Sequence, residues 1–210
     1  MKKTFLRFAA LATCALLILG GCSKGSKYSS SEKSEEKKET SSKSKKEAHK
    51  LDVDVLPAPH LKAQGGNHYE SKNLIDGKPH TAWVIDITKE IDNWMLGELP
   101  DILQFTLDAD QVDYIMLTNG YAKNEAHFRK NARPREIVIS RTPFAKTKPS
   151  DVLYRGAIKD TMEPQKLKVD KKYDNSRPTN KIYISFTGDW VKGEKWPNDF
   201  SVSEIEFYGH

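Results

Sequence analysis

The stretch Lys181-Ile182-Tyr183-Ile184-Ser185-Phe186 decides the fold class, because aliphatic and aromatic side chains alternate along it with more polar ones. Successive side chains of a β-strand point to opposite faces of a sheet, so this alternation predicts a strand with one buried face. Residues 103–107 (Leu-Gln-Phe-Thr-Leu) and 204–208 (Glu-Ile-Glu-Phe-Tyr) alternate in the same way. The pattern therefore predicts half-buried strands in the middle and near the end of the chain.

Two more apolar runs, at residues 112–118 and 136–140, predict strands that are buried more deeply. Pro, Gly, Asn and Asp cluster between these segments, and such residues favour turns. No long stretch has a clean helical period. Residues 51–210 have the size of one ordinary domain. We therefore predict that they form an all-β domain, a β-sandwich or jelly roll of antiparallel strands.

Residues 1–21 have the layout of a secretory signal, with basic residues followed by an apolar run at 8–19. The run is too short for a transmembrane helix, which needs about 20 apolar residues. It ends in two glycines before Cys22, which resembles a bacterial lipobox, whose cysteine is diacylated and becomes the N-terminus. The alternative is an ordinary signal peptide with an incidental cysteine. We favour a lipoprotein held at the cell membrane or outer membrane, on its extracytoplasmic side, because the apolar run stops at the cysteine.

Residues 22–50 are predicted to form a disordered tether behind the lipid anchor, because Ser, Lys and Glu dominate them and give little apolar surface to bury. A single helix is the alternative, which the serine content disfavours. The chain has a formal net charge of +5. Residues 1–21 contribute +3 and residues 23–50 contribute +4, which leaves −2 for residues 51–210. We therefore expect no nucleic-acid binding by the domain.

The motifs of the common enzyme classes are missing from the sequence. Its six histidines show no H-E-x-x-H spacing, and there is no G-x-S-x-G elbow or glycine-rich phosphate loop. Cys14 lies in the signal segment, so the domain has no disulfide and no thiol nucleophile. A glycosidase needs two carboxylates across a cleft, an arrangement that sequence does not resolve. We predict that the protein is not an enzyme. The alternative is a hydrolase.

Three segments resemble one superfamily when they are taken in order. Residues 76–83 fit D-G-x-x-x-T-x-W, and residues 199–209 fit D-x-x-x-S-E-I-x-F-Y-G. Between them, Asn119-Gly120-Tyr121 is followed by Asn131 and Arg133. Together these motifs resemble discoidin-like, galactose-binding-fold domains. The middle segment is most similar to the glycan-binding translocation domain of streptococcal NAD glycohydrolase, which also occurs in bacterial lipoproteins.

The resemblance covers about residues 55–210 and implies a galactose-binding-like jelly roll of eight strands in two sheets, with ligand-binding loops at one end and no catalysis. It also implies a structural Ca²⁺ held by oxygens of Asp76, Thr81 and Glu204. The alternative is the same loop closed by hydrogen bonds alone. In either case we expect a positive φ at Gly77 and a core position for Trp83.

Two segments are candidate glycan-binding loops, because aromatic rings pack on the C–H faces of sugars while Arg and Asn reach hydroxyls. The candidate residues are Tyr121, His127, Arg129, Asn131, Arg133, Trp190 and Trp196. We expect Tyr121 and Arg133 to be partly exposed, and only one of the two tryptophans to be exposed. In the alternative, Tyr121 and Phe128 fold the loop onto the core while Asn131 and Arg133 satisfy its carbonyls.

The sequence therefore predicts a lipid-anchored surface module that binds a glycan or glycoconjugate. The alternative is a protein–protein interaction module, an adhesin or a scaffold of an envelope complex. A flat apolar patch around Trp190 and Trp196, without a concave polar pocket, would favour that alternative.

Overall fold

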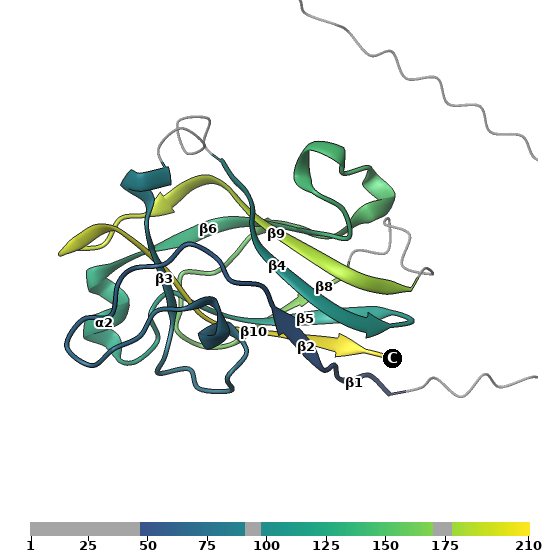
Figure 1. Cartoon of the computed structure of the whole chain (residues 1–210), viewed down its shortest axis with the longest axis horizontal. Coiled ribbons are helices and arrows are strands. Elements are labelled where there is room, and N and C mark those ends of the chain that lie inside the picture. Colours follow the sequence, from purple (N-terminus) through teal and green to yellow (C-terminus); the bar gives the residue numbers. More distant parts are fainter. Residues whose placement is uncertain (1–46, 91–97, 170–177) are drawn as a thin grey trace, which may run out of the picture. The chain divides into compact units, whose positions relative to one another are not determined.

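The computed structural model describes residues 47–90, 98–169 and 178–210 (Figure 1). The predicted signal peptide, Cys22 and the tether up to residue 46 lie outside the described residues, so these assignments stay predictions. Residues Ser44–His210 form one compact unit with its own hydrophobic core, so we expect this unit to fold by itself. None of the helices in the described part of the chain has the length and apolar character needed to cross a membrane.

Strands dominate the described residues, and all five predicted strand segments lie inside observed strands. The strands are β1 (His49–Lys50), β2 (Val53–Val55), β3 (Trp83–Asp86), β4 (Glu98–Ala109), β5 (Val112–Asn119), β6 (Asn131–Ser140), β7 (Val152–Ala157), β8 (Gln165–Lys168), β9 (Thr179–Val191) and β10 (Trp196–Gly209). The helical turns are η1 (Ser71–Leu74), η2 (Ile87–Glu90), α2 (Glu125–Lys130), η3 (Phe144–Lys146) and η4 (Pro149–Asp151).

The strands form two antiparallel layers. One layer has the order β2-β4-β9-β6-β7, and the other has β8-β5-β10 with the short β1 and β3 paired to β10. A short parallel contact between β6 and the start of β10 joins the two layers. The described residues thus form ten strands, where the resemblance implied eight. The predicted all-β sandwich is confirmed.

Aromatic rings from the two layers meet in the core. The ring of Phe105 on β4 lies 5.1 Å from that of Phe207 on β10. Phe186 on β9 contacts both Trp83 at 6.3 Å and Phe200 at 5.1 Å between ring centroids. Trp83 is fully buried, as predicted, and its Nε1–H donates to the carbonyl of Pro59 at 2.8 Å. Large aromatic side chains contribute much of the burial that holds such layers together.

The connection between β5 and β6, where the sequence predicted a candidate glycan-binding loop that carries Tyr121 to Arg133, contains regular structure. Residues 125–130 form the short helix α2, and β6 already begins at Asn131. Asn124 caps the helix, because its Oδ1 accepts the backbone N–H of His127 at 3.0 Å. Asn131 and Arg133 therefore lie on a strand, where their side chains point to fixed sides of the sheet.

Candidate functional site

The first and last motifs meet in space. The backbone N–H of Gly77 donates to Glu204 Oε1 at 3.0 Å. Gly77 has a φ of 70°, as predicted. Within the loop, Thr81 Oγ1 donates to Asp76 Oδ2 at 3.0 Å, and the N–H of Lys78 donates to Asp76 Oδ1 at 2.9 Å. The three predicted metal ligands thus belong to one cluster.

The Glu204 side chain fits a role as a ligand for a hard cation. It is 6% exposed, and its Oε2 is buried with no hydrogen-bond partner among the described residues. Burial, together with the nearby Asp76 carboxylate, raises the pKa of Glu204 to about 7. In the described ranges no group of three or more His, Cys, Asp or Glu side chains could hold a metal. A cation here would therefore rely on two carboxylates, the Thr81 hydroxyl and carbonyl oxygens.

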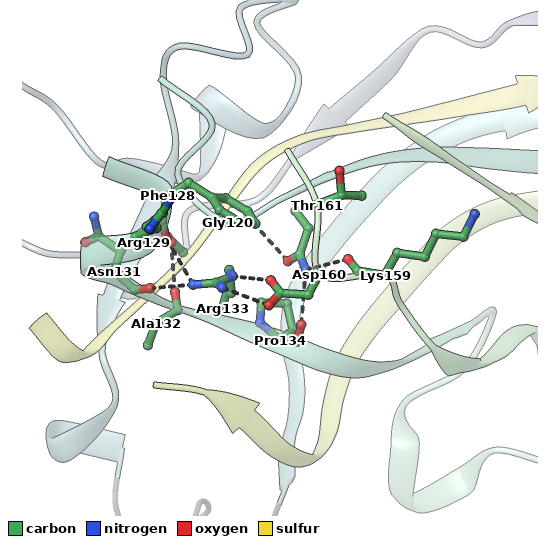
Figure 2. Close-up of polar contacts among 12 residues, drawn as sticks. Gly120, Phe128, Arg129, Asn131, Ala132, Arg133, Pro134, Lys159, Asp160 and Thr161 are labelled. Carbon is green, nitrogen blue, oxygen red and sulfur yellow. Dashed lines mark hydrogen bonds and ion pairs between the residues drawn. The ribbon is translucent and has the colours of Figure 1, made fainter. Parts of the chain in front are cut away.

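Arg133 is buried, so the prediction that it is partly exposed is wrong. Its Nε and Nη2 donate to the two oxygens of Asp160 at 2.5 and 2.9 Å (Figure 2). Its Nη1 donates to the carbonyls of Phe128 and Asn131 at 3.0 and 3.3 Å. The guanidinium also lies 4.1 Å from the ring centroid of Phe128. Arg133 is buried because a carboxylate and two carbonyls at the end of α2 satisfy it.

Tyr121 and Asn131 are also buried. Tyr121 is 4% exposed, which contradicts the exposure predicted for it, because its ring packs edge-on between Tyr69 and His127. Asn131 Nδ2 donates to the carbonyl of His127 at 2.8 Å and closes the end of α2. Phe128 is buried as well. The structure thus matches the alternative, in which Tyr121 and Phe128 fold the segment onto the core while Asn131 and Arg133 satisfy its carbonyls.

His127 and Arg129 remain accessible on α2. Burial, together with the nearby Lys123 and Lys130, lowers the pKa of His127, so its ring is neutral at neutral pH. Its Nδ1 lies 2.9 Å from Asn124 Oδ1. Arg129 is exposed and forms an ion pair of 2.7 Å with Glu125 one turn earlier.

Of the two tryptophans on either side of the β9–β10 connection (residues 192–195), Trp196 is the exposed one, at 36%. Trp190 packs partly against the core, and its Nε1–H donates to the carbonyl of Pro197 at 3.2 Å. This confirms that only one of the two is exposed. This connection is tied to α2, because the N–H of Glu194 donates to the carbonyl of Arg129 at 3.0 Å. Trp196 therefore stands beside the end of the helix.

Sequence reasoning missed the loop that completes this surface. Tyr69 is half-buried, and its ring edge lies against Tyr121 at 6.3 Å between centroids. Lys123 Nζ donates to Asn67 Oδ1 at 3.1 Å and thereby joins the Asn67 loop to the segment before α2. The signal in the sequence was the turn Gly65-Gly66, whose glycines have φ values of 56° and 79° and which precedes this polar and aromatic pair.

Partly exposed aromatic rings, with amide and ammonium groups around them, form a surface next to α2 that we call the α2 surface. Its residues are Asn67, Tyr69, Lys123, Asn124, His127 and Trp196. Ring faces and edges of this kind pack on sugar C–H groups, while amides and ammonium groups hydrogen-bond to hydroxyls.

The two-layer fold and the joined first and last motifs define a discoidin-like domain of the F5/8 type C class. The family model for the NAD glycohydrolase translocation F5/8 type C domain matches residues 48–208. The chain belongs to this family.

Solved structures with a similar fold include CBM32 domains. CBM32-5 from Clostridium perfringens, in complex with GalNAc-β-1,3-galactose, is 15% identical with a TM-score of 0.47 and covers 74% of this chain and 94% of its own. CBM32-3 of a family 31 glycoside hydrolase from the same organism is 13% identical with a TM-score of 0.49, covering 75% and 91%. An F5/8 type C domain from Bacteroides fragilis is 16% identical with a TM-score of 0.46, covering 78% and 97%.

At these identities and TM-scores, the three structures carry no ligand over to this chain. A search of curated proteins finds no match.

Proposed function

We propose that this protein is a lipid-anchored, non-catalytic carbohydrate-binding module that binds glycans through the α2 surface. The observation that carries the proposal is that Tyr69 and His127 both rest on the buried ring of Tyr121. Two partly exposed rings are thus held in place from behind, with polar groups around them. Membership of the F5/8 type C family supports a binding role.

The loops of the α2 surface are ordered before a ligand arrives. The Lys123–Asn67 hydrogen bond links two segments, and Asn124 caps α2. A ligand that binds to fixed groups loses less conformational entropy from the protein, which favours affinity. Trp196 extends the surface toward the β9–β10 connection, and Lys195 Nζ lies 4.9 Å from the Trp196 ring centroid. A sugar chain of more than one residue would contact both parts.

A carboxylate pair near this surface is the strongest argument for the hydrolase alternative. Asp86 on β3 lies opposite Asp199 on β10. Burial raises the pKa of Asp199, whereas hydrogen bonds from Thr88 lower that of Asp86. Two carboxyl groups whose pKa values are shifted in opposite directions can act as an acid and a base. However, Asp86 already accepts from Thr88 Oγ1 at 2.6 Å and pairs with Lys89 at 3.5 Å. We therefore assign this pair to the rim of a binding surface and expect no hydrolysis of bound glycans.

The protein–protein alternative gains little from the exposed apolar residues. A flat patch around both tryptophans would support it, but Trp190 packs inward and Trp196 alone is exposed. Among the described residues the other large exposed hydrophobic side chain is Leu56, next to β2, at 45%. Two such residues on separate elements do not make a contiguous apolar patch.

We further propose that Asp76, Thr81 and Glu204 hold a structural Ca²⁺. The support is the buried Glu204 Oε2, because an unsatisfied buried acceptor costs about 1–3 kcal/mol unless a proton or a cation meets it. The cation would tie the Asp76 loop to β10 and supply no chemistry to a ligand. The alternative is a loop closed by hydrogen bonds alone. A calcium titration distinguishes this alternative from a bound Ca²⁺.

The proposed location rests on Cys22 and the signal segment before it. Lipidation would hold the domain at the cell membrane or outer membrane, with residues 23–50 as the spacer. Metabolic labelling with a palmitate analogue in cells that express the full chain should mark the processed protein, and Cys22→Ser should abolish the label and release the protein from the membrane fraction. A labelled Cys22→Ser variant would overturn the anchor.

Glycan arrays and titrations with Ser44–His210 test the binding proposal. Tyr69→Ala and His127→Ala should each weaken binding by about tenfold, because each removes a ring that contacts the sugar. Tyr183→Ala is the matched control, since Tyr183 is a half-buried tyrosine on β9 away from the α2 surface. The absence of saccharide binding at millimolar concentrations, or an equal loss in all three variants, would overturn the proposal.

A further inference from the structure

A groove with a volume of about 770 Å³, lined by both polar and apolar groups, lies beside the edge strands β7 and β8. Among the described residues β7 pairs with β6 of one layer and β8 pairs with β5 of the other, and residues 158–164 connect them. The volume falls in the range of small-molecule sites, about 300–1,000 Å³. The lining includes Tyr154, Lys159, Asp160, Thr161, Gln165 and Lys166. None of these residues belongs to the α2 surface.

The ring of Tyr154 forms a fixed wall of the groove. Its hydroxyl donates to the carbonyl of Ala157 at 2.9 Å, so the ring lies along its own strand. A Cβ at Gly156 would stand only 3.3 Å from the Tyr154 hydroxyl oxygen, so the glycine leaves room for this arrangement. The ring is half-buried, and burial raises the pKa of Tyr154. A half-exposed, immobile ring is a suitable partner for the C–H face of a sugar.

The backbone of the connection is held from two sides at Lys159. Its N–H donates to Gln165 Oε1 at 2.8 Å. Its carbonyl accepts from Gln165 Nε2 and from Asn119 Nδ2, both at 3.2 Å. Figure 2 shows the Lys159 side chain extending away from this anchored backbone. The connection is therefore preorganised, while the Lys159 ammonium stays available.

Asp160 is oriented by the buried Arg133 and still faces solvent. Both of its oxygens accept from Arg133, yet its side chain is 49% exposed, compared with 8% for Arg133. An ionised carboxylate has about four acceptor sites, so two remain open to hydroxyl donors. Because Arg133 fixes the carboxylate, a ligand would not have to order it.

We propose that this groove is a second saccharide-binding site, which takes a neutral sugar. The charged lining residues are two lysines and two carboxylates, Lys159, Lys166, Asp160 and Glu163, so their formal charges cancel and favour no ionic ligand. Vicinal hydroxyls would donate to Asp160 and accept from Lys159 and Thr161, while Tyr154 packs on the ring. The site is independent of the α2 surface and would make the module bivalent for glycans, which raises avidity toward a polymer.

Titration of ¹⁵N-labelled Ser44–His210 with galactose, N-acetylgalactosamine, N-acetylglucosamine and mannose tests the proposal by NMR. At least one sugar should shift the backbone amides of residues 158–167 at millimolar concentrations. Asp160→Asn, which keeps an oxygen for Arg133, should weaken this binding by about tenfold, as a hydrogen bond to a charged group predicts. Lys159→Ala tests the ammonium group and Tyr154→Leu tests the ring. Both variants keep Asp160, the partner of Arg133. Arg155→Ala, next to Tyr154 and outside the groove lining, is the matched control and should leave binding unchanged.

The two sites can fail separately. The second site would be overturned if none of the four sugars shifted the amide signals of residues 158–167, even if the amide signals of α2 shifted. Groove shifts without α2 shifts would support the second site and contradict the assignment of binding to the α2 surface. Groove binding that is equally strong in Asp160→Asn, Lys159→Ala and Tyr154→Leu would also overturn the proposal.

Discussion

The backbone N–H of Gly77 reaches Glu204 Oε1 at 3.0 Å across 127 residues of sequence. This contact joins the loop after η1 to the middle of β10, which forms the centre of one layer. The second carboxylate oxygen is buried with no partner among the described residues. Glu204 is therefore the residue at which the stability of the domain should respond most clearly to protons and cations.

Stability should fall as the pH rises through the pKa of Glu204. Burial raises this pKa from 4.5 to about 7, so the folded state binds the proton more tightly than the unfolded state. The stabilisation is complete below 4.5 and is lost by about pH 7, with an upper limit of about 3 kcal/mol. Urea unfolding with EDTA should show this slope in the wild type and a flatter one in Glu204→Gln. Parallel pH profiles of the two proteins would refute the assignment.

Calcium should reverse that loss of stability. A cation between Asp76 and Glu204 favours both ionised carboxylates, so millimolar Ca²⁺ should raise Tm most at pH values above about 7. Mg²⁺ is the control, because it accepts irregular coordination less readily. Glu204→Gln should show little response to Ca²⁺. If Ca²⁺ left the Tm of the wild type unchanged, the loop would be closed by hydrogen bonds alone.

Gly120→Ala should destabilise the domain more than a change at another glycine with positive φ. Gly120 has a φ of +65°, and an added Cβ would lie 2.7 Å from ring carbons of Phe128. Gly66 has a φ of +79° with nothing within 4 Å, so Gly66→Ala measures the backbone cost alone, about 1 kcal/mol. We expect the Gly120 variant to lose about 2–3 kcal/mol in urea unfolding. Equal losses in the two variants would show that Phe128 gives way without cost.

The strands and the Gly77 turn could be predicted from sequence because their signals are local. Alternation marks Leu103, Phe105 and Leu107 as core residues, and all three are buried. A D-G pair within the loop motif likewise marks a positive φ. Such features depend on neighbours a few residues away, so one sequence suffices to find them.

The environments of Tyr121 and Arg133 could not be predicted, because their partners lie far along the chain. Tyr121 packs against Tyr69, and Arg133 finds its carboxylate at Asp160, 27 residues later on another connection. Arginine and tyrosine in a polar segment suggest exposure until such partners are known. The helix α2 could have been predicted even though it is short, because Asn124 before Glu125 is an N-cap pattern.

Arg133→Ala should be among the most destabilising single changes on β6. It would leave the carbonyls of Phe128 and Asn131 without their donor and would remove the cation over the Phe128 ring. Buried acceptors left unsatisfied cost about 1–3 kcal/mol each, so a total loss of about 3–4 kcal/mol is expected in urea unfolding. Arg135 lies two residues further along the same strand and has an exposed side chain. Arg135→Ala should therefore change stability by about 0.5 kcal/mol or less.

The same change should also loosen α2, because Arg133 is a link between that helix and Asp160. Hydrogen exchange of the α2 amides should therefore accelerate in Arg133→Ala by more than global destabilisation predicts, and Arg135→Ala should leave it unchanged. Arg133→Lys should recover only part of the loss, since an ammonium cannot form the paired contact with Asp160. Full recovery by lysine would show that charge alone, and not the forked geometry, holds the helix in place.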